Sequence, residues 1–228
     1  MTLRSMLSPA VEDYLKAIYK LQIEHPETSA GGGATTNAIA KRMSVSAAST
    51  TNMLKRLAEM KLVNYESYKG VTLTDAGMKV ALEIIRHHRL LELYLHEVMG
   101  YSWDKVHDEA EYLEHHISEE FEDKIAEMLG DPTHDPHGHP IPTKDGKLPS
   151  HKFSTLADAE PGQNVVVQLV SDADPEMLKY MAELKLRPNA KVRVVSKAPF
   201  NGPITLEVEG KKRSLGSEVA RHISVSIA

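Results

Sequence analysis

The sequence contains no cysteine among its 228 residues. This absence excludes a disulfide framework, zinc fingers with thiolate ligands, iron–sulfur clusters and catalysis by a cysteine nucleophile. The sequence also lacks any apolar run near the roughly 18 residues that a membrane span requires, and its first residues lack the apolar core of a signal peptide. We therefore expect a cytoplasmic protein that does not enter a membrane. The length favours two or three domains.

Charge is spread unevenly along the chain, although the net charge is only −5. Residues 1–74 carry 9 Lys and Arg against 6 Asp and Glu, whereas residues 75–130 carry 5 against 14. Ten of the 12 histidines lie between His87 and His151. The slightly basic first part is suited to phosphate, and the acidic, His-rich middle is suited to a divalent cation.

Residues 1–74 follow the order of a winged helix-turn-helix. Helical patterns begin at Ser8-Pro9 and again over residues 35–43 and 46–63, and a hairpin is predicted over 63–74 as the wing. The first turns of the 46–63 helix are small and hydroxylated, which lets a helix enter the major groove and contact base edges. The expected DNA contacts are Lys41, Ser46, Ala48, Ser49, Thr51, Asn52, Lys55, Arg56 and Lys69.

Residues 75–130 are predicted to form two long helices, one over 75–100 and one from Trp103 to about residue 130. On the first, His88 and Glu92 are i, i+4 neighbours. On the second, acids and imidazoles recur at i, i+4, i+7 and i+8, within about 120° of one face: His107, Glu111, Glu114 and His115. Clustered carboxylates and imidazoles repel or lose solvation unless a cation lies among them, so we predict metal binding.

Residues 131–152 are rich in Pro, Gly and His and are predicted to form a linker. We interpret its histidines as part of a solvated loop, with a metal-binding role as the alternative: His134, His137 and His139. Beyond the linker, short apolar or alternating segments predict strands over 164–170, 191–196, 203–209 and 222–227, with one helix near 175–184. This pattern predicts a small, strongly bent antiparallel sheet or barrel.

Three segments give the chain a resemblance to the diphtheria toxin repressor and manganese transport regulator family: EDYLKAIY at 12–19, RHHRLLELYL at 86–95 and KVHDEAEYLEHH at 105–116. The resemblance covers nearly the whole chain and implies a metal-activated, dimeric transcriptional repressor that is mainly α with a small β domain. It implies a winged helix-turn-helix over 1–74, metal-binding and dimerisation helices over 75–130, and an SH3-like (FeoA-like) domain over 153–228.

The resemblance also implies two metal sites per subunit. Its primary site matches Asp13, Glu111, Glu114 and His115. Its ancillary site matches His88, Glu92 and His107, and Asp172 of the SH3-like domain is the candidate further ligand. Iron sensors of the family carry methionine and cysteine where this chain has Asp13 and Glu111, which favours Mn²⁺ over Fe²⁺. Manganese sensors often carry a glutamate in place of Lys16, so this chain combines features of both groups.

We therefore expect a transcriptional regulator of metal-ion homeostasis that is activated by Mn²⁺, or alternatively by Fe²⁺, and is not an enzyme. It is expected to bind a palindromic DNA operator as a homodimer. A di-iron helical enzyme is one rival, but it needs Glu-x-x-His pairs, and the residues three before His115 and His116 are Tyr112 and Leu113. A winged-helix regulator that senses an organic ligand is the other, and DNA binding with and without chelator separates the three.

Overall fold

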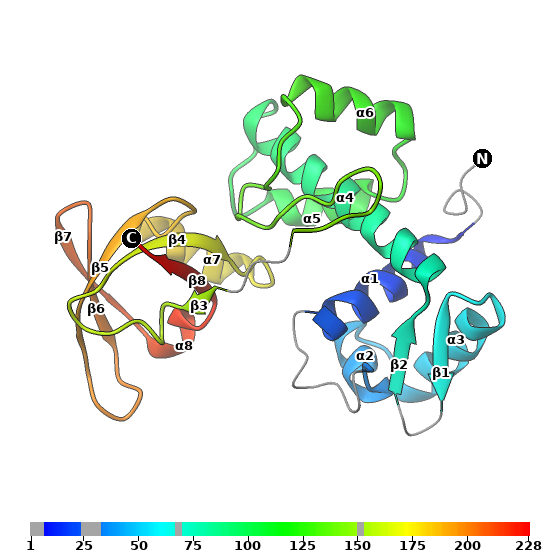
Figure 1. Cartoon of the computed structure of the whole chain (residues 1–228), viewed down its shortest axis with the longest axis horizontal. Coiled ribbons are helices and arrows are strands. Elements are labelled where there is room, and N and C mark those ends of the chain that lie inside the picture. The colour runs from blue at the N-terminus through cyan, green and yellow to red at the C-terminus, as the bar shows by residue number, and fades with distance from the viewer. Residues whose placement is uncertain (1–6, 24–32, 67–69, 150–152) are drawn as a thin grey trace. The chain divides into compact units, whose positions relative to one another are not determined.

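The computed structural model describes residues 7–23, 33–66, 70–149 and 153–228. The chain divides into two compact units, one made of residues 1–87 with 142–147 and the other of residues 88–141 with 148–228. Figure 1 labels their helices and strands. None of the described helices is long and apolar enough to cross a membrane.

The first unit begins with a helical domain that carries a two-stranded wing. Its elements are α1 (Pro9–Ile23), α2 (Thr36–Arg42), α3 (Ala47–Glu59), and the antiparallel strands β1 (Val63–Glu66) and β2 (Gly70–Leu73). Ser46 caps α3, because its hydroxyl accepts a hydrogen bond from the Ser49 N–H. The helix ends at Glu59 rather than near residue 63, since Lys61 takes a left-handed conformation with φ 60°. The predicted winged helix-turn-helix is confirmed.

The middle of the chain forms three helices instead of the two that were predicted. They are α4 (Asp75–Glu97), α5 (Val106–Leu113) and α6 (Glu119–Met128). The single helix predicted from Trp103 to about residue 130 is therefore wrong. A second N-cap interrupts it, because the Ser118 hydroxyl accepts a hydrogen bond from the Phe121 N–H and three acidic residues follow in the first turn of α6.

Residues 153–228 form a domain built on one antiparallel sheet. Its elements are β3 (Ser154–Thr155), β4 (Asn164–Val170), α7 (Pro175–Glu183), β5 (Lys191–Lys197), β6 (Ile204–Val208), β7 (Lys211–Leu215), α8 (Ser217–Ala220) and β8 (Ile223–Ile227). Among the described residues the strand order is β3-β8-β4-β5-β6-β7. Register shifts within the β4–β8 and β5–β6 pairs bend the sheet. The predicted bent antiparallel sheet is confirmed.

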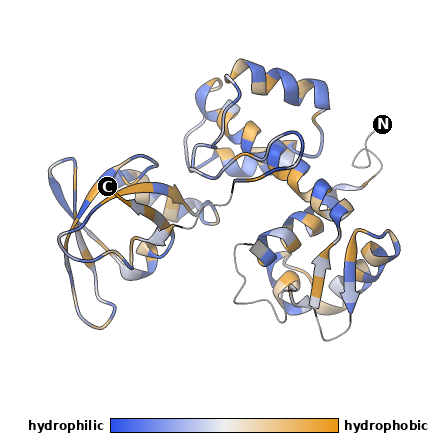
Figure 2. Ribbon diagram, in the orientation of Figure 1, coloured by the Kyte–Doolittle hydropathy of each residue, from blue (hydrophilic) through white to orange (hydrophobic). Residues whose placement is uncertain are grey.

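Buried and more exposed residues alternate along β5 and β6, and the buried hydrophobic side chains of the sheet and its helices make most of the domain core. Figure 2 shows hydrophobic residues along the strands of this domain. β7 was not predicted, because its sequence KKRSL is mostly exposed and lacks the alternation of a half-buried strand. β3 and α8 were also not predicted, and each is only two to four residues long.

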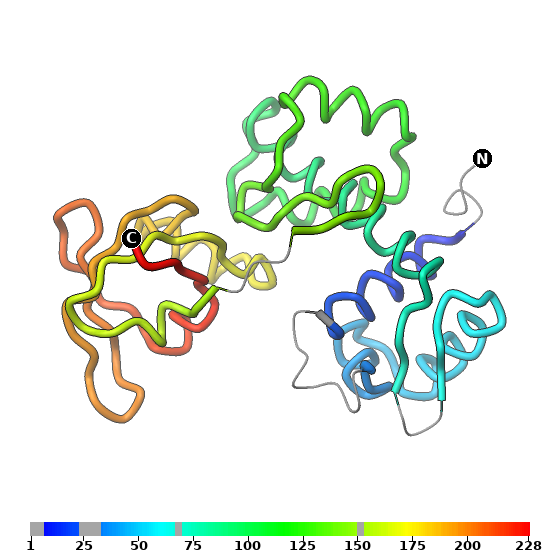
Figure 3. The backbone as a smooth tube through the Cα atoms, in the orientation of Figure 1, coloured from blue at the N-terminus to red at the C-terminus, as the bar shows by residue number. Residues whose placement is uncertain are grey.

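Residues 129–149 connect α6 to the region before β3. The described backbone in this segment has turns and one isolated bridge, between His134 and Pro140, but no helix (Figure 3). Although its composition is typical of a linker, several of its side chains are buried, Asp135 and His137 among them.

Candidate functional site

α3 has one buried face and one exposed face. Thr50, Leu54 and Leu57 are buried, which packs the helix into its domain. The opposite face carries small, hydroxylated, amide and basic side chains that are all exposed: Ala48, Ser49, Asn52, Lys55 and Arg56. Such a face can contact base edges with its first turns and phosphates with its basic residues.

Three other predicted DNA contacts lie in the part of the chain that the structure describes. Lys41 on α2 and Ser46 are exposed, and Thr51 is partly exposed. The Thr51 hydroxyl donates a hydrogen bond to the Ala47 carbonyl at 2.8 Å, so its methyl group and oxygen lone pairs are what it can offer to DNA. Lys69, the predicted wing contact, lies outside the described residues.

Four predicted metal ligands converge in the second unit. His88 and Glu92 lie on α4, His107 on α5, and Asp172 directly after β4. Glu92 Oε1 lies 3.0 Å from His88 Nε2 and from His107 Nδ1, and Asp172 Oδ2 lies 3.7 Å from His107 Nδ1. One ligand atom from each residue lies within 4.8 Å of the others. A single cation with bonds of about 2.0–2.2 Å to nitrogen and oxygen can therefore reach several of them at once.

The other oxygen of Glu92 faces His137, a linker residue not chosen as a ligand from the sequence. Glu92 Oε2 and His137 Nδ1 are 3.8 Å apart, and both side chains are fully buried. Within the described part of the chain neither atom has a hydrogen-bond partner, and 3.8 Å is too long for one. Buried polar atoms are normally satisfied. A cation between the two atoms would satisfy both, so this donor set fits a metal ion.

Opposite charges keep this cluster ionised. Burial alone would raise the pKa of the Glu92 carboxyl, but the charge of His88 and hydrogen bonds from the surrounding histidines hold that pKa well below its ordinary value. Burial likewise opposes protonation of His137, but its interaction with Glu92, helped by Asp135 and Asp172, raises its pKa to about 9. In the metal-free protein at neutral pH, both ring nitrogens of His137 therefore carry a proton.

Asp135 organises the linker around it. Its Oδ1 accepts the backbone N–H groups of His137 and His139 at 2.8 and 2.9 Å, and its Oδ2 lies 3.2 Å from His139 Nδ1. Burial works against the His139 cation, but the Asp135 carboxylate outweighs it and raises the pKa of His139. The expectation of a solvated loop is therefore wrong for these residues and right for the exposed His134. The alternation Asp-x-His-x-His over 135–139 is the sequence signal that indicates a ligand group.

His88 also connects the Glu92 cluster to the predicted primary-site residues. Its Nδ1 lies 2.5 Å from Glu114 Oε2 and 3.4 Å from Glu111 Oε2, while its Nε2 faces Glu92. The Glu114 side chain is fully buried, the Glu111 side chain is 46% exposed, and His115 Nε2 lies 3.6 Å from Glu114 Oε1. The structure thus places His88 between the two groups of ligands that the sequence separates.

Asp13, the remaining predicted ligand, lies on α1 in the first unit and is half-buried. Its neighbours on the helix, Tyr14 and Leu15, are buried.

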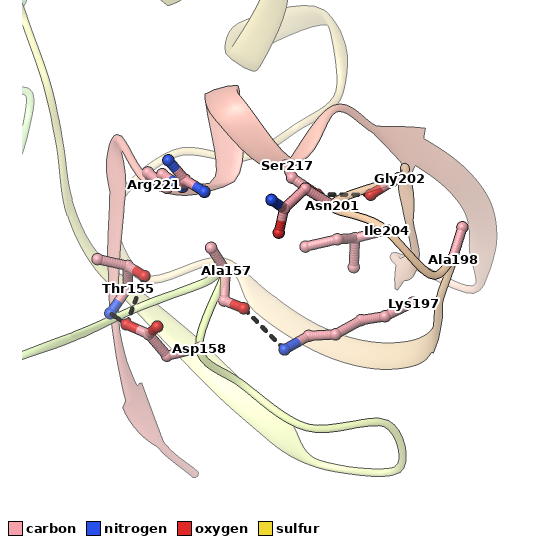
Figure 4. Close-up of a pocket in the computed structure, with 10 residues that line it drawn as sticks. All are labelled: Thr155, Ala157, Asp158, Lys197, Ala198, Asn201, Gly202, Ile204, Ser217 and Arg221. Atoms are coloured by element: carbon pink, nitrogen blue, oxygen red, sulfur yellow. Dashed lines mark hydrogen bonds between the residues drawn. The ribbon is translucent and has the colours of Figure 1, made fainter.

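A polar pocket of about 420 Å³ in the C-terminal domain contains none of these residues (Figure 4). Lys197 Nζ donates a hydrogen bond to the Ala157 carbonyl, and the Ser217 hydroxyl donates one to the Gly202 carbonyl. The residues that line it include one carboxylate and no histidine. This pocket therefore has the wrong donor set for the metal chemistry of the Glu92 cluster.

Comparison with known proteins assigns each part of the chain. Residues 6–71 match the iron dependent repressor N-terminal DNA binding domain, residues 74–143 match the iron dependent repressor metal binding and dimerisation domain, and residues 154–227 match the FeoA domain. The diphtheria toxin repressor of Corynebacterium diphtheriae is 28% identical over 229 residues, which cover 96% of this chain and 97% of that protein.

Two further similar proteins are also described as regulators of transcription. The HTH-type transcriptional regulator MntR of Oceanobacillus iheyensis is 33% identical over 124 residues, which cover 54% of this chain and 80% of that protein. A solved structure of a manganese-dependent transcriptional repressor in complex with manganese is 38% identical, covers 96% of this chain and 100% of that one, and has a TM-score of 0.85.

Proposed function

The chain belongs to the diphtheria toxin repressor and manganese transport regulator family of metal-dependent transcriptional repressors, and from that premise we propose that Mn²⁺ activates it. In this proposal the protein binds a palindromic operator as a homodimer and represses genes of metal-ion homeostasis. Each subunit holds two metal ions, one at a first site that includes Asp13 and one at a second site centred on Glu92.

The observation that carries the proposal is the pair of buried atoms at the second site. Glu92 Oε2 and His137 Nδ1 face each other at 3.8 Å with no hydrogen-bond partner among the described residues. A gap of this length is what two ligands of one ion leave between them, and it is too long for a direct hydrogen bond. His107 and Asp172 complete the second site, with His88 shared between the two sites.

The chemistry of the ligands favours Mn²⁺ as the metal. At the first site Asp13, Glu111 and Glu114 offer oxygen and His115 offers nitrogen, and the chain has no cysteine to offer sulfur. Carboxylate-rich sites suit Mn²⁺, whereas thiolate and thioether ligands favour more polarisable metals. When bound, the ion supplies a divalent charge that neutralises the carboxylates around it. Activation by Fe²⁺ is the alternative, because imidazole also suits Fe²⁺, and a titration with both metals tests it.

The first site connects metal binding to DNA binding through Asp13. This residue lies on α1, the helix that leads into the DNA-binding domain, whereas Glu111 and Glu114 belong to α5 and its C-terminal end. Carboxylates that face each other without a cation repel. When they share a cation, α1 loses freedom relative to the dimerisation helices. The population then shifts towards dimers whose two α3 helices match successive half-sites of the operator.

An apolar hollow of about 470 Å³ supports the homodimer. It is lined by Leu91, Tyr94, Leu95, Met99, Leu113, His116, Ile117, Ser118 and Phe121. Met99 is 55% exposed and Phe121 is 46% exposed. Apolar side chains gathered on one surface mark an interaction site, and this surface lies within the part of the chain that matches the metal binding and dimerisation domain.

The experiment that tests the proposal measures DNA binding and metal binding on one preparation. Samples of the metal-free protein are first mixed with Mn²⁺, with Fe²⁺ under anaerobic conditions, or with chelator. Each sample then selects the DNA duplexes that it binds from a random-sequence library. Fluorescence anisotropy on the selected duplex then gives DNA affinity against free metal, and calorimetry gives the number of ions bound per subunit. We expect two Mn²⁺ ions per subunit and a palindromic duplex that is bound only when metal is present.

Three outcomes of this experiment would contradict parts of the proposal. DNA binding that is equal with Mn²⁺ and with chelator would favour a regulator of organic ligands. No selected duplex would favour a metalloenzyme. Activation by Fe²⁺ under conditions where Mn²⁺ fills both sites without DNA binding would replace manganese by iron and leave the repressor assignment in place.

A further inference from the structure

We infer that Trp103 is a positioning residue for the Glu92–His137 site and couples metal binding there to the docking of the C-terminal domain. This inference rests on the second metal site proposed above. Trp103 is the only tryptophan of the chain, and it lies just before α5, whose His107 belongs to that site.

The side chain of Trp103 belongs to the core of the C-terminal domain, although the residue itself precedes α5. It is 3% exposed and lies in the same buried cluster as Val167, Val170 and Leu178. The guanidinium carbon of Arg187, which follows α7, lies 5.2 Å from the centre of the indole ring. The helical region therefore contributes one of the C-terminal domain's core residues.

Trp103 also fixes His137 from two directions. Its indole Nε1–H donates a hydrogen bond to the Pro136 carbonyl at 2.9 Å, and its own carbonyl oxygen lies 3.0 Å from His137 Nε2. Because a carbonyl can only accept, His137 Nε2 carries a proton. The remaining ring nitrogen, Nδ1, then faces Glu92. Such second contacts of a ligand histidine set its tautomer and its orientation.

The C-terminal domain holds the same segment from the other side. The Val170 N–H, at the end of β4, donates a hydrogen bond to the His137 carbonyl at 2.9 Å. Gly138 has φ +92°, and a Cβ on it would lie 2.1 Å from the Gln168 carbonyl oxygen, so the linker backbone approaches β4 as closely as glycine alone permits. Residues 136–138 are therefore held between Trp103 and β4.

Coupling between the metal and the docked domain follows from these contacts. The hydrogen bonds of the His137 backbone to Val170 and of its ring to the Trp103 carbonyl hold His137 opposite Glu92. The Val170 hydrogen bond comes from the C-terminal domain itself, and the Trp103 indole that holds Pro136 is buried in the core of that domain. By reciprocity, docking raises metal affinity by the same factor by which bound metal stabilises docking.

The test uses Trp103→Phe in the full-length protein, because phenylalanine keeps an aromatic ring in the core and removes the N–H that holds Pro136. We expect Mn²⁺ affinity at the second site to fall by about 10-fold, the lower end for loss of a ligand's supporting contact, with the first site unchanged. Hydrogen exchange by mass spectrometry gives the reciprocal measurement. In the wild type, Mn²⁺ should slow exchange of the Val170 amide, and in Trp103→Phe this protection should be much smaller.

Two controls separate positioning from loss of core stability. Leu156→Val trims the same core without touching the linker and should leave second-site affinity unchanged, and His134→Gln removes an exposed histidine of the linker. An equal loss of affinity in Leu156→Val and Trp103→Phe would overturn the inference, as would unchanged affinity and unchanged Val170 protection in Trp103→Phe.

Measurements on the wild type and on Glu92→Gln also decide the matter if Trp103→Phe does not fold. Trp103 fluorescence should change with the same midpoint as second-site filling and should not change in Glu92→Gln. A wild-type protein that binds one Mn²⁺ per subunit would refute the second site itself. Binding of two ions with no change in Trp103 emission or Val170 exchange would refute only the coupling.

Discussion

Proton release on metal binding gives the sharpest test of the second site. The pKa of His137 is raised from its ordinary 6.5 to about 9 by the carboxylates around it. At pH 7.5 an imidazole with that pKa is almost fully in its cationic form, whereas only about a tenth of an imidazole with the ordinary pKa is cationic. Metal can bind His137 Nδ1 only after this proton leaves. Second-site affinity should therefore rise about tenfold per pH unit between pH 7 and 8 through His137 alone.

The comparison that isolates this proton uses His137→Gln. Its side-chain amide can still donate to the Trp103 carbonyl, but it cannot titrate. Calorimetric titrations of Mn²⁺ at pH 7.0, 7.5 and 8.0, each in buffers of different ionisation enthalpy, give both affinity and protons released per ion. We expect the slope of log affinity against pH to be about one unit larger in the wild type than in His137→Gln, and equal in the wild type and His134→Gln.

NMR titration of the histidine rings in metal-free protein checks the cause directly. The resonance missing from His137→Gln should titrate near pH 9 in the wild type. A His137 pKa near 6.5 together with equal affinity slopes would refute the reasoning, because the attraction of Glu92 would then be too weak to hold the proton.

The raised pKa of His137 also predicts how the stability of the metal-free protein depends on pH. Because the folded-state pKa of His137 lies above its unfolded value of 6.5, its contribution is complete below pH 6.5 and is lost as the pH rises through about 9. A shift of this size corresponds to about 3 kcal/mol, to order of magnitude. Denaturant unfolding of metal-free wild type between pH 6.5 and 9.5 should therefore show a loss that His137→Gln does not show.

The remaining predictions concern the first site and DNA binding. Glu114→Gln should abolish metal-dependent operator binding without unfolding the protein, and wild-type DNA affinity at saturating Mn²⁺ would contradict its role as a ligand. Arg56→Ala should weaken binding to all duplexes alike and reduce the salt slope by about one, whereas Asn52→Ala should change the preference among duplexes; the opposite pattern in selection experiments would reverse the two assignments. Asp13→Met with Glu111→Cys should shift activation towards Fe²⁺ and Co²⁺, and an unchanged order of metals in the anisotropy assay would contradict it.

Local patterns predicted most of the fold because they report on contacts between near neighbours. Ser46 begins α3 in sequence and in structure, since an N-cap depends only on the first turn of its own helix. The apolar segment of β4 was predicted with its bounds, and β5, β6 and β8 were predicted to within one residue at each end. The break between α5 and α6 was not predicted, because the helical spacing from His107 to His115 was assumed to continue beyond Ser118. In the structure Ser118 is the N-cap of α6.

The ligands of the candidate site also differ in whether a local sequence pattern predicts them. His88 and Glu92 could be paired from their i, i+4 spacing, because both lie on one helix. Asp172 entered through a family resemblance, and the structure places it near His107. His137 was interpreted as solvated because Pro, Gly and His dominate its segment. Its burial depends on contacts to residues 34 and 33 positions away, Trp103 and Val170, which no local pattern encodes.

Glu92 explains why the metal-free protein can fold with such a cluster inside it. A buried carboxylate is costly unless it is paired, and Glu92 is fully buried between His88 and His107 on one side and His137 on the other. The proton on His137 supplies the positive charge in the metal-free state, so the buried carboxylate is paired even without the metal.

Metal binding at this position is then an exchange of a proton for an ion. At pH 7, competition with a proton held at a pKa of about 9 lowers the apparent metal affinity about a hundredfold. A sensor needs an affinity that matches the free metal level rather than the tightest one that its ligands allow. The carboxylates around His137 therefore affect the free metal concentration at which the site fills in two ways. Neutralising Asp135 or Asp172 would lower the pKa of His137, which weakens competition from the proton, but it would also remove a negative charge that attracts the metal ion. The balance of these two effects can be measured residue by residue with the same affinity-against-pH titration.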